Sequence, residues 1–142
     1  MDKVAIVFWT GSGNTEAMAQ AVEEGAKNAG AETVLNFVGD TSAAEVATFD
    51  KIILGCPAMG DESLEEYDFE PFFEELLPDL AGKKVGIFGS YAWNEGDWIM
   101  NWKARLEEAG VTLTVEPVKA YSYPDDDALG ACRELGKTIA EA

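Results

Sequence analysis

Apolar, β-rich runs alternate with helical patterns along almost the whole chain, and this alternation restricts the possible folds more than any other feature. Five apolar runs predict strands, at residues 4–9, 33–38, 51–55, 84–89 and 111–118. Apolar residues at helical spacing predict a helix after each run, at residues 15–29, 43–49, 69–77, 97–109 and 127–142. Strands that alternate with helices form a parallel sheet, because each right-handed crossover sets the next strand parallel to the last. We therefore expect a doubly wound α/β fold with helices on both faces of a parallel sheet.

The length and composition fit one domain that spans residues 1–142. A chain of 142 residues is too short for two ordinary domains, and 47% of its residues are hydrophobic, which is enough for a sizeable core. The two cysteines, Cys56 and Cys132, form no metal-binding pattern or disulfide framework, which fits the reducing cytoplasm. The apolar run after Lys3 is too short for a signal peptide, and no run is long enough to cross a membrane. We expect a cytoplasmic protein with no metal site and no membrane insertion.

The charge balance is strongly acidic, with 27 Asp and Glu against 10 Lys and Arg and a formal net charge of -17. Such a surface repels nucleic acid and anionic membranes and favours encounters with basic proteins. The acidity also has a simpler explanation, because a large net charge keeps a small protein soluble. The chain has no histidine, the usual general base near neutral pH, which counts against many hydrolases and transferases.

A loop rich in glycine and hydroxyl groups separates the first predicted strand from the first predicted helix. It consists of Thr10, Gly11, Ser12, Gly13, Asn14 and Thr15. The glycines permit a tight turn that aims backbone N–H groups at one point, and the following helix adds the positive end of its dipole. No Lys or Arg lies between Lys3 and Lys27, so peptide dipoles would supply the attraction for a phosphate group. The alternative is a helix start that is merely capped by hydroxyl groups.

Two better-known phosphate motifs do not fit this loop. A nucleotide hydrolase needs Gly-Lys-Ser/Thr, whereas Gly13 is followed by Asn14 and Thr15. The dinucleotide-binding motif needs a third small residue where this chain has Glu16. The loop therefore disfavours both an ATPase and an NAD-binding protein.

Three motifs follow one another along the chain, from Trp9 to Thr15, from Leu54 to Glu62 and from Phe88 to Trp93. Together they resemble a flavodoxin of the short-chain type found in anaerobes. The resemblance implies a flavodoxin-like five-stranded parallel sheet with strand order 2-1-3-4-5, the order that flavodoxin itself exemplifies. It implies non-covalently bound FMN, with the phosphate in the first loop and the flavin ring between the other two.

The function implied by the resemblance is that of a low-potential one-electron carrier, not an enzyme. Such a carrier would be a cytoplasmic monomer. It would shuttle electrons between flavodoxin or ferredoxin reductases and other oxidoreductases that have basic surfaces. A flavin-dependent quinone or nitro reductase is the alternative, but it would also need a pocket for its substrate or for nicotinamide.

The residues implied to contact FMN lie in all three motifs. They are Trp9, Thr10, Gly11, Ser12, Gly13, Asn14 and Thr15 in the first, Ala58, Met59, Gly60, Asp61 and Glu62 in the second, and Ser90, Tyr91, Ala92 and Trp93 in the third. Met59 is implied to lie on the inner face of the ring, Trp93 on the outer face, and Glu62 at the ring N3–H. Alternatively, Met59 and Trp93 are ordinary core residues, and Glu62 is one more solvated acid.

Gly60 and Asp61 are implied to tune the redox potential. One-electron reduction adds a proton to N5 of the flavin ring, so the protein has to offer a new acceptor there. The resemblance implies that the peptide between Gly60 and Asp61 turns over and presents its carbonyl, which glycine allows because a positive φ carries no Cβ penalty. A static turn would explain the glycine equally well.

The sequence departs from the family pattern at a few positions. Ala92 and Asn94 stand where glycines are expected, and Pro57 has no N–H to donate to a phosphate. Eight carboxylates lie between Asp61 and Glu75 without a Lys or Arg among them. Because fully reduced flavin is an anion, these charges are expected to oppose the second electron and to form a docking face for basic partners.

Overall fold

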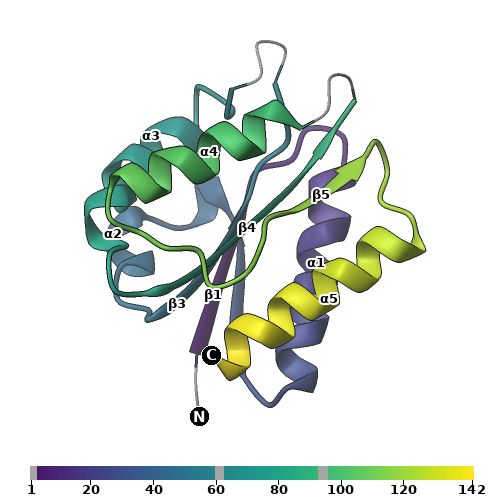
Figure 1. Cartoon of the computed structure of the whole chain (residues 1–142), viewed down its shortest axis with the longest axis horizontal. Coiled ribbons are helices and arrows are strands. Elements are labelled where there is room, and N and C mark those ends of the chain that lie inside the picture. The colour runs from purple at the N-terminus through teal and green to yellow at the C-terminus, as the bar shows by residue number, and fades with distance from the viewer. Residues whose placement is uncertain (1–2, 60–62, 93–95) are drawn as a thin grey trace.

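A five-stranded parallel sheet lies between two layers of helices in the computed structural model, which describes residues 3–59, 63–92 and 96–142 (Figure 1). Neighbouring strands follow the order β2-β1-β3-β4-β5, and every pairing is parallel. The strands are β1 (Lys3–Phe8), β2 (Glu32–Phe37), β3 (Lys51–Gly55), β4 (Lys84–Tyr91) and β5 (Val118–Tyr121). The predicted fold class and strand order are confirmed.

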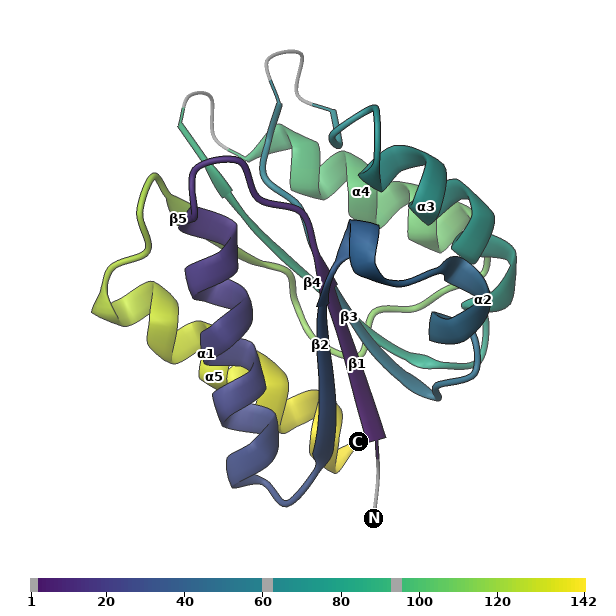
Figure 2. The same cartoon turned by 180° about the vertical axis from the view of Figure 1, so that it is seen from behind.

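Helices cover both faces of the sheet, as the opposite views in Figures 1 and 2 show. One face carries α1 (Asn14–Asn28) and α5 (Asp126–Glu141). The other face carries α2 (Ala43–Val46), α3 (Phe69–Leu76) and α4 (Asp97–Glu108), with short 3-10 turns at Val38–Asp40 and Leu77–Asp79. Each helix overlaps its predicted range. The second predicted helix, however, ends at Val46 rather than at residue 49.

The strands in the middle of the sheet are buried on both faces, because helices cover each side. In β1, Ala5 and Val7 face the core under α3 and α4, whereas Val4 and Ile6 face the core under α1 and α5. This alternation is the period of two that an extended strand imposes on its side chains. A strand that is buried on both faces therefore has a continuous apolar sequence, which is the pattern that predicted it.

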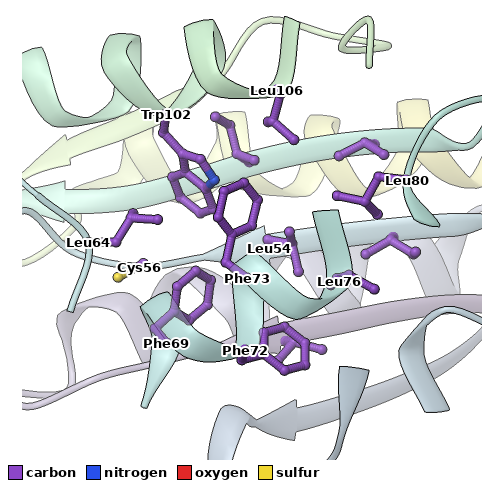
Figure 3. Close-up of a cluster of buried hydrophobic side chains, with 14 of the residues drawn as sticks. Leu54, Cys56, Leu64, Phe69, Phe72, Phe73, Leu76, Leu80, Trp102 and Leu106 are labelled. Atoms are coloured by element: carbon purple, nitrogen blue, oxygen red, sulfur yellow. The ribbon is translucent and has the colours of Figure 1, made fainter. Parts of the chain in front are cut away.

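The core under α3 and α4 is built largely from aromatic side chains. The ring of Trp102 meets the ring of Phe69 edge to face, with centroids 5.6 Å apart, and that of Phe73 at 5.9 Å (Figure 3). Perpendicular aromatic pairs of this kind contribute about 0.5–1.5 kcal/mol beyond the burial of their area. This rigid layer lies directly beneath the carboxyl end of β3, where Cys56 is buried in the same cluster (Figure 3).

The predicted fifth strand at 111–118 is wrong, because the strand begins only at Val118 and runs to Tyr121. Val111 and Leu113 pack into the core on one face of the sheet, but Val115 and Val118 pack on the other. One strand would keep alternate residues on a single face, so this segment passes around the edge of the sheet instead. Pro117 has no N–H to donate to a ladder just before the strand begins.

Within the described ranges, no helix combines the length and apolar character that a membrane crossing requires. The same residues contain no cluster of three or more Cys, Asp or Glu placed to hold a metal ion.

Candidate functional site

The carboxyl ends of β1, β3 and β4 meet at one end of the sheet (Figure 1). Backbone hydrogen bonds continue between these strands into the loops that follow them. The N–H of Trp9 donates to Gly55 O at 3.0 Å, and the N–H of Ala58 donates to Ser90 O at 2.9 Å. The structure therefore brings together the three loops that the sequence identified. Here they are called the phosphate loop (residues 10–15), the first ring loop (57–64) and the second ring loop (92–96).

The phosphate loop leads into α1 through a glycine in a left-handed conformation. Gly13 is the N-cap of α1 with φ +94°, and its N–H donates to Thr10 Oγ1 at 2.9 Å. The helix makes its first backbone hydrogen bond from Ala17 N–H to Gly13 O. The N–H groups of Asn14, Thr15 and the next residue consequently have no partner within the helix. Such donors, together with the helix dipole, are suited to an anion without the help of a charged side chain.

Trp9 and Gly11 pack closely where β1 ends. A Cβ on Gly11 would lie 2.9 Å from Cη2 of the Trp9 indole, so a larger residue would displace the ring. Trp9 is half-buried against the aromatic core, whereas Ser12 is exposed. The close packing explains why the loop needs glycine at position 11 in addition to the turn at Gly13.

Ser90 connects all three loops. Its hydroxyl lies 3.1 Å from Thr15 Oγ1, and both side chains are almost completely buried. Its carbonyl accepts the N–H of Ala58, and Tyr91 and Ala92 follow it in the chain. Sequence reasoning assigned Thr15, Ala58 and Ser90 to one site, and the structure places them in direct contact.

Only part of the first ring loop lies within the described residues. Ala58 and Met59 are half-buried, and the N–H of Met59 donates to Ser63 O at 3.1 Å. Gly60, Asp61 and Glu62, to which the sequence assigned ring contacts and redox tuning, lie outside the described residues.

Tyr91, the last residue of β4 before the second ring loop, packs against other aromatic rings. The Tyr91 ring lies 5.7 Å from that of Trp98 and 5.5 Å from that of Tyr121, and Lys119 Nζ lies 5.8 Å from its centroid. Ala92 is exposed. Trp93, assigned to the outer face of the flavin, and Asn94 lie outside the described residues. The alanine that stands in place of the expected glycine at position 92 is therefore exposed.

Cys56, Glu65 and Trp98 are bonded to one another at the two ends of the first ring loop, although none of them was among the residues predicted for the site. Trp98 Nε1 donates to Cys56 O at 3.0 Å, and the N–H of Glu65 donates to Cys56 Sγ at 3.4 Å. Burial raises the pKa of the Cys56 thiol, which therefore stays protonated at neutral pH. Nothing in the sequence separated Glu65 from the acids around it, because only long-range contacts reveal its burial.

The acidic segment between residues 61 and 75 is less uniform than its sequence. Glu65 is buried, and Glu70 forms a two-pronged ion pair with Arg105, whose two N–H···O distances are both 2.7 Å. The hydrogen bonds from Arg105 lower the pKa of Glu70. Glu66 and Asp68 are exposed beside Tyr67, whose side chain is 81% exposed. The exposed members are thus the ones that can act on an approaching partner.

Comparison with known proteins links this site to one family. The model of the family described as Flavodoxin matches residues 6–136. A flavodoxin from Megasphaera elsdenii is 48% identical over 139 residues, which cover 98% of this chain and 99% of that protein. A flavodoxin from Clostridium beijerinckii is 42% identical over 135 residues, covering 95% of this chain and 97% of that protein.

A solved structure gives the same relationship in three dimensions. The solution structure of two-electron reduced Megasphaera elsdenii flavodoxin matches with a TM-score of 0.86 at 47% sequence identity. The match covers 98% of this chain and 99% of that chain. The similarity therefore includes the whole sheet.

Proposed function

This chain belongs to the flavodoxin family, and on that premise we propose that the phosphate loop and the two ring loops together hold FMN. Flavodoxins are electron carriers that bind FMN, so the predicted cofactor and carrier function are confirmed, and the chain is a carrier rather than an enzyme. When bound, FMN supplies a ring that takes up and releases single electrons.

The unpaired N–H groups at the start of α1 carry the proposal for the phosphate end. They follow Gly13, the N-cap with a positive φ, and the phosphate loop contains no lysine or arginine. An oxyanion fits such a set of donors. We assign the phosphate to Thr10, Gly11, Ser12, Gly13, Asn14 and Thr15, and we place the adjacent Trp9 among the residues that bind the cofactor.

The flavin ring is assigned to the two loops that Ser90 joins to the phosphate loop. The half-buried Met59 supplies a polarizable thioether suited to an aromatic face. The proposed ring contacts are Ala58, Met59, Gly60, Asp61, Glu62, Ser90, Tyr91, Ala92 and Trp93. The parts played by Gly60, Asp61, Glu62 and Trp93 are proposed from the sequence alone.

The carrier works with redox proteins such as reductases and oxidoreductases. We propose that these partners present basic surfaces, because the net charge is -17 and Glu66 and Asp68 are exposed beside the site. We also propose a cytoplasmic monomer made of one domain over residues 1–142 that binds no nucleic acid and does not insert into membranes. Added salt should slow electron transfer to a basic c-type cytochrome, and a rate independent of salt would contradict the basic partner.

Titration of the apoprotein with FMN and with riboflavin tests the site directly. Two charge-assisted hydrogen bonds to the phosphate should make FMN bind about 100-fold more tightly than riboflavin, which lacks it. Ser42→Ala, which changes an exposed cap on α2, should leave both affinities unchanged. Equal affinities for the two flavins would contradict the phosphate assignment.

A further inference from the structure

Glu65 lies just beyond the first ring loop, and its carboxylate is buried. Its side chain is 3% exposed, whereas the neighbouring Glu66 is exposed. Oε2 accepts the N–H of Tyr67 at 2.8 Å, and Oε1 accepts those of Asp68 and Phe69 at 2.7 and 2.8 Å. A buried carboxylate is stable only when such donors replace water. The three amides lead into α3, whose N-cap is Asp68 and whose first residue is Phe69, so the carboxylate also lies at the positive end of that helix.

The backbone of Glu65 fastens the other end of the same loop. Its N–H donates to Cys56 Sγ at 3.4 Å, and its carbonyl accepts the N–H of Glu70 at 2.8 Å. Cys56 is itself fixed, because its N–H donates to Phe88 O at 3.1 Å and its carbonyl accepts Trp98 Nε1. Glu65 therefore joins the end of β3 to the start of α3 and closes the first ring loop at its base.

The two ends of this loop are also buried side by side in the aromatic core. Cys56 is 0% exposed and Leu64 is 4% exposed, and both lie beside the rings of α3 and α4 (Figure 3). Farther along, the N–H of Ala58 is bonded to Ser90 and that of Met59 to Ser63. The base of the loop is thus fixed, and Glu65 holds that base by both its side chain and its backbone.

We propose that Glu65 is a positioning residue for FMN: by closing the base of the first ring loop, it directs that loop onto the flavin ring. The inference rests on the proposed function, because it needs the first ring loop to contact the flavin. It assigns to Glu65 a role different from that of the exposed acids around it. Those acids act through their charge, whereas Glu65 acts through the geometry of the loop.

Glu65→Gln and Glu66→Gln form a matched pair that separates geometry from charge. Each removes one negative charge at adjacent positions, but only Glu65→Gln places an amide NH₂ against backbone N–H donors. In Glu65→Gln, the Kd for FMN should rise about tenfold or more. Hydrogen exchange at the amides of Tyr67, Asp68 and Phe69 should accelerate about tenfold or more in the apoprotein. In Glu66→Gln, exchange should be unchanged and FMN should bind equally or slightly more tightly.

The first reduction potential gives a readout that a purely structural residue would not move. In the FMN-bound protein, the shift caused by Glu65→Gln should persist at high salt, because it follows from a displaced loop. The shift caused by Glu66→Gln should disappear there, because salt screens an exposed charge. Equal effects of the two variants on affinity and potential would overturn the inference.

The other possible results show which step of the proposal is wrong. Unchanged exchange at the three amides in Glu65→Gln would overturn the closure of the loop by Glu65. Faster exchange with unchanged FMN affinity and potential would overturn its positioning role alone, whereas equal affinities of the wild type for FMN and riboflavin would contradict the proposed function. If Glu65→Gln does not fold, Glu65→Asp keeps the charge but withdraws the carboxylate by one methylene. It should give the same changes on a smaller scale, and wild-type behaviour would overturn the inference.

Discussion

The starts of α1 and α3 use the same physical device for opposite purposes. Both helices begin beside the carboxyl end of the sheet with backbone N–H groups that the helix itself cannot pair. At α1, the phosphate loop contains no acidic side chain, and the donors are left for a ligand. At α3, Glu65 itself takes the donors: its buried carboxylate accepts the N–H of Phe69, and its carbonyl accepts that of Glu70. A helix N-terminus thus binds a ligand only where the chain has not already occupied it.

The largest effect is expected for Trp98→Phe, which tests the contacts on the α3 side of this comparison. Trp98→Phe removes the indole N–H from Cys56 O, and a buried carbonyl left unpaired costs about 1–3 kcal/mol of unfolding free energy, in addition to lost packing. Urea unfolding of the apoprotein measures the loss. Trp102→Phe is a matched control, because Trp102 is equally buried on α4 and its Nε1 has no hydrogen-bond partner in the described structure. An equal loss in the two variants would show that the Cys56 bond contributes nothing.

The next largest effect is expected for Gly13→Ala, which tests the start of α1. Gly13→Ala places a Cβ on a residue with φ +94°, which costs about 1–2 kcal/mol, and no atom lies within 4 Å to add a clash. The loop can relieve this strain by moving its donors, so the Kd for FMN should rise about tenfold. Gly30→Ala imposes the same strain at the far end of α1, where φ is also +94°, and should lower stability without changing FMN affinity. Equal weakening of FMN binding by both would remove the special role of Gly13.

A smaller effect is expected at the contact between the phosphate loop and the end of β4. The hydroxyl groups of Thr15 and Ser90 are 3.1 Å apart and connect the phosphate loop to the end of β4. Thr15→Val, Ser90→Ala and the double variant should show a coupling of about 1 kcal/mol in FMN binding, which a double-mutant cycle measures by isothermal titration. Strict additivity would mean that the two loops hold FMN independently.

The smallest effect concerns acid stability, which should come from the α3 side. The hydrogen bonds from Arg105 lower the pKa of Glu70 in the folded protein, so its contribution is complete above the unfolded pKa of about 4.3. That contribution is lost as the pH falls through the lower folded pKa. Because both side chains are partly exposed, the pair should contribute about 1 kcal/mol or less.

Urea unfolding of the wild type and Glu70→Gln at several pH values measures this contribution. The difference in unfolding free energy should be constant near neutral pH and shrink below about pH 4. The phosphate loop has no titratable side chain and should add nothing to this dependence. A difference that grows toward low pH would contradict the ion pair.

Most of the fold was predictable because it depends on local patterns. The apolar runs of β1 and β3 are continuous because both faces of these strands are covered, and the helical spacing in α1, α4 and α5 marks the faces that pack on the sheet. The error at 111–118 has a physical cause as well. Its alternating apolar residues imitate a strand, but they are shared between the two cores on either side of the sheet edge.

The loops of the site were predictable from their position after β1, β3 and β4, but the contacts among them were not. Thr15 and Ser90 are 75 residues apart in the chain, and nothing local shows that their hydroxyl groups meet. Glu65 and Glu66 are identical in the sequence and opposite in the structure, one buried at the base of a loop and the other exposed.

By itself, the sequence determined the α/β alternation, the uncharged phosphate loop and the resemblance that pointed to FMN. These features depend on residues that are neighbours in the chain, where periodicity and turn chemistry act directly. Only the tertiary structure decided which N–H groups stay available for a ligand and which the chain takes for itself. That choice depends on a carboxylate being carried into the interior by packing between distant segments, and burial of this kind is a property of the assembled fold.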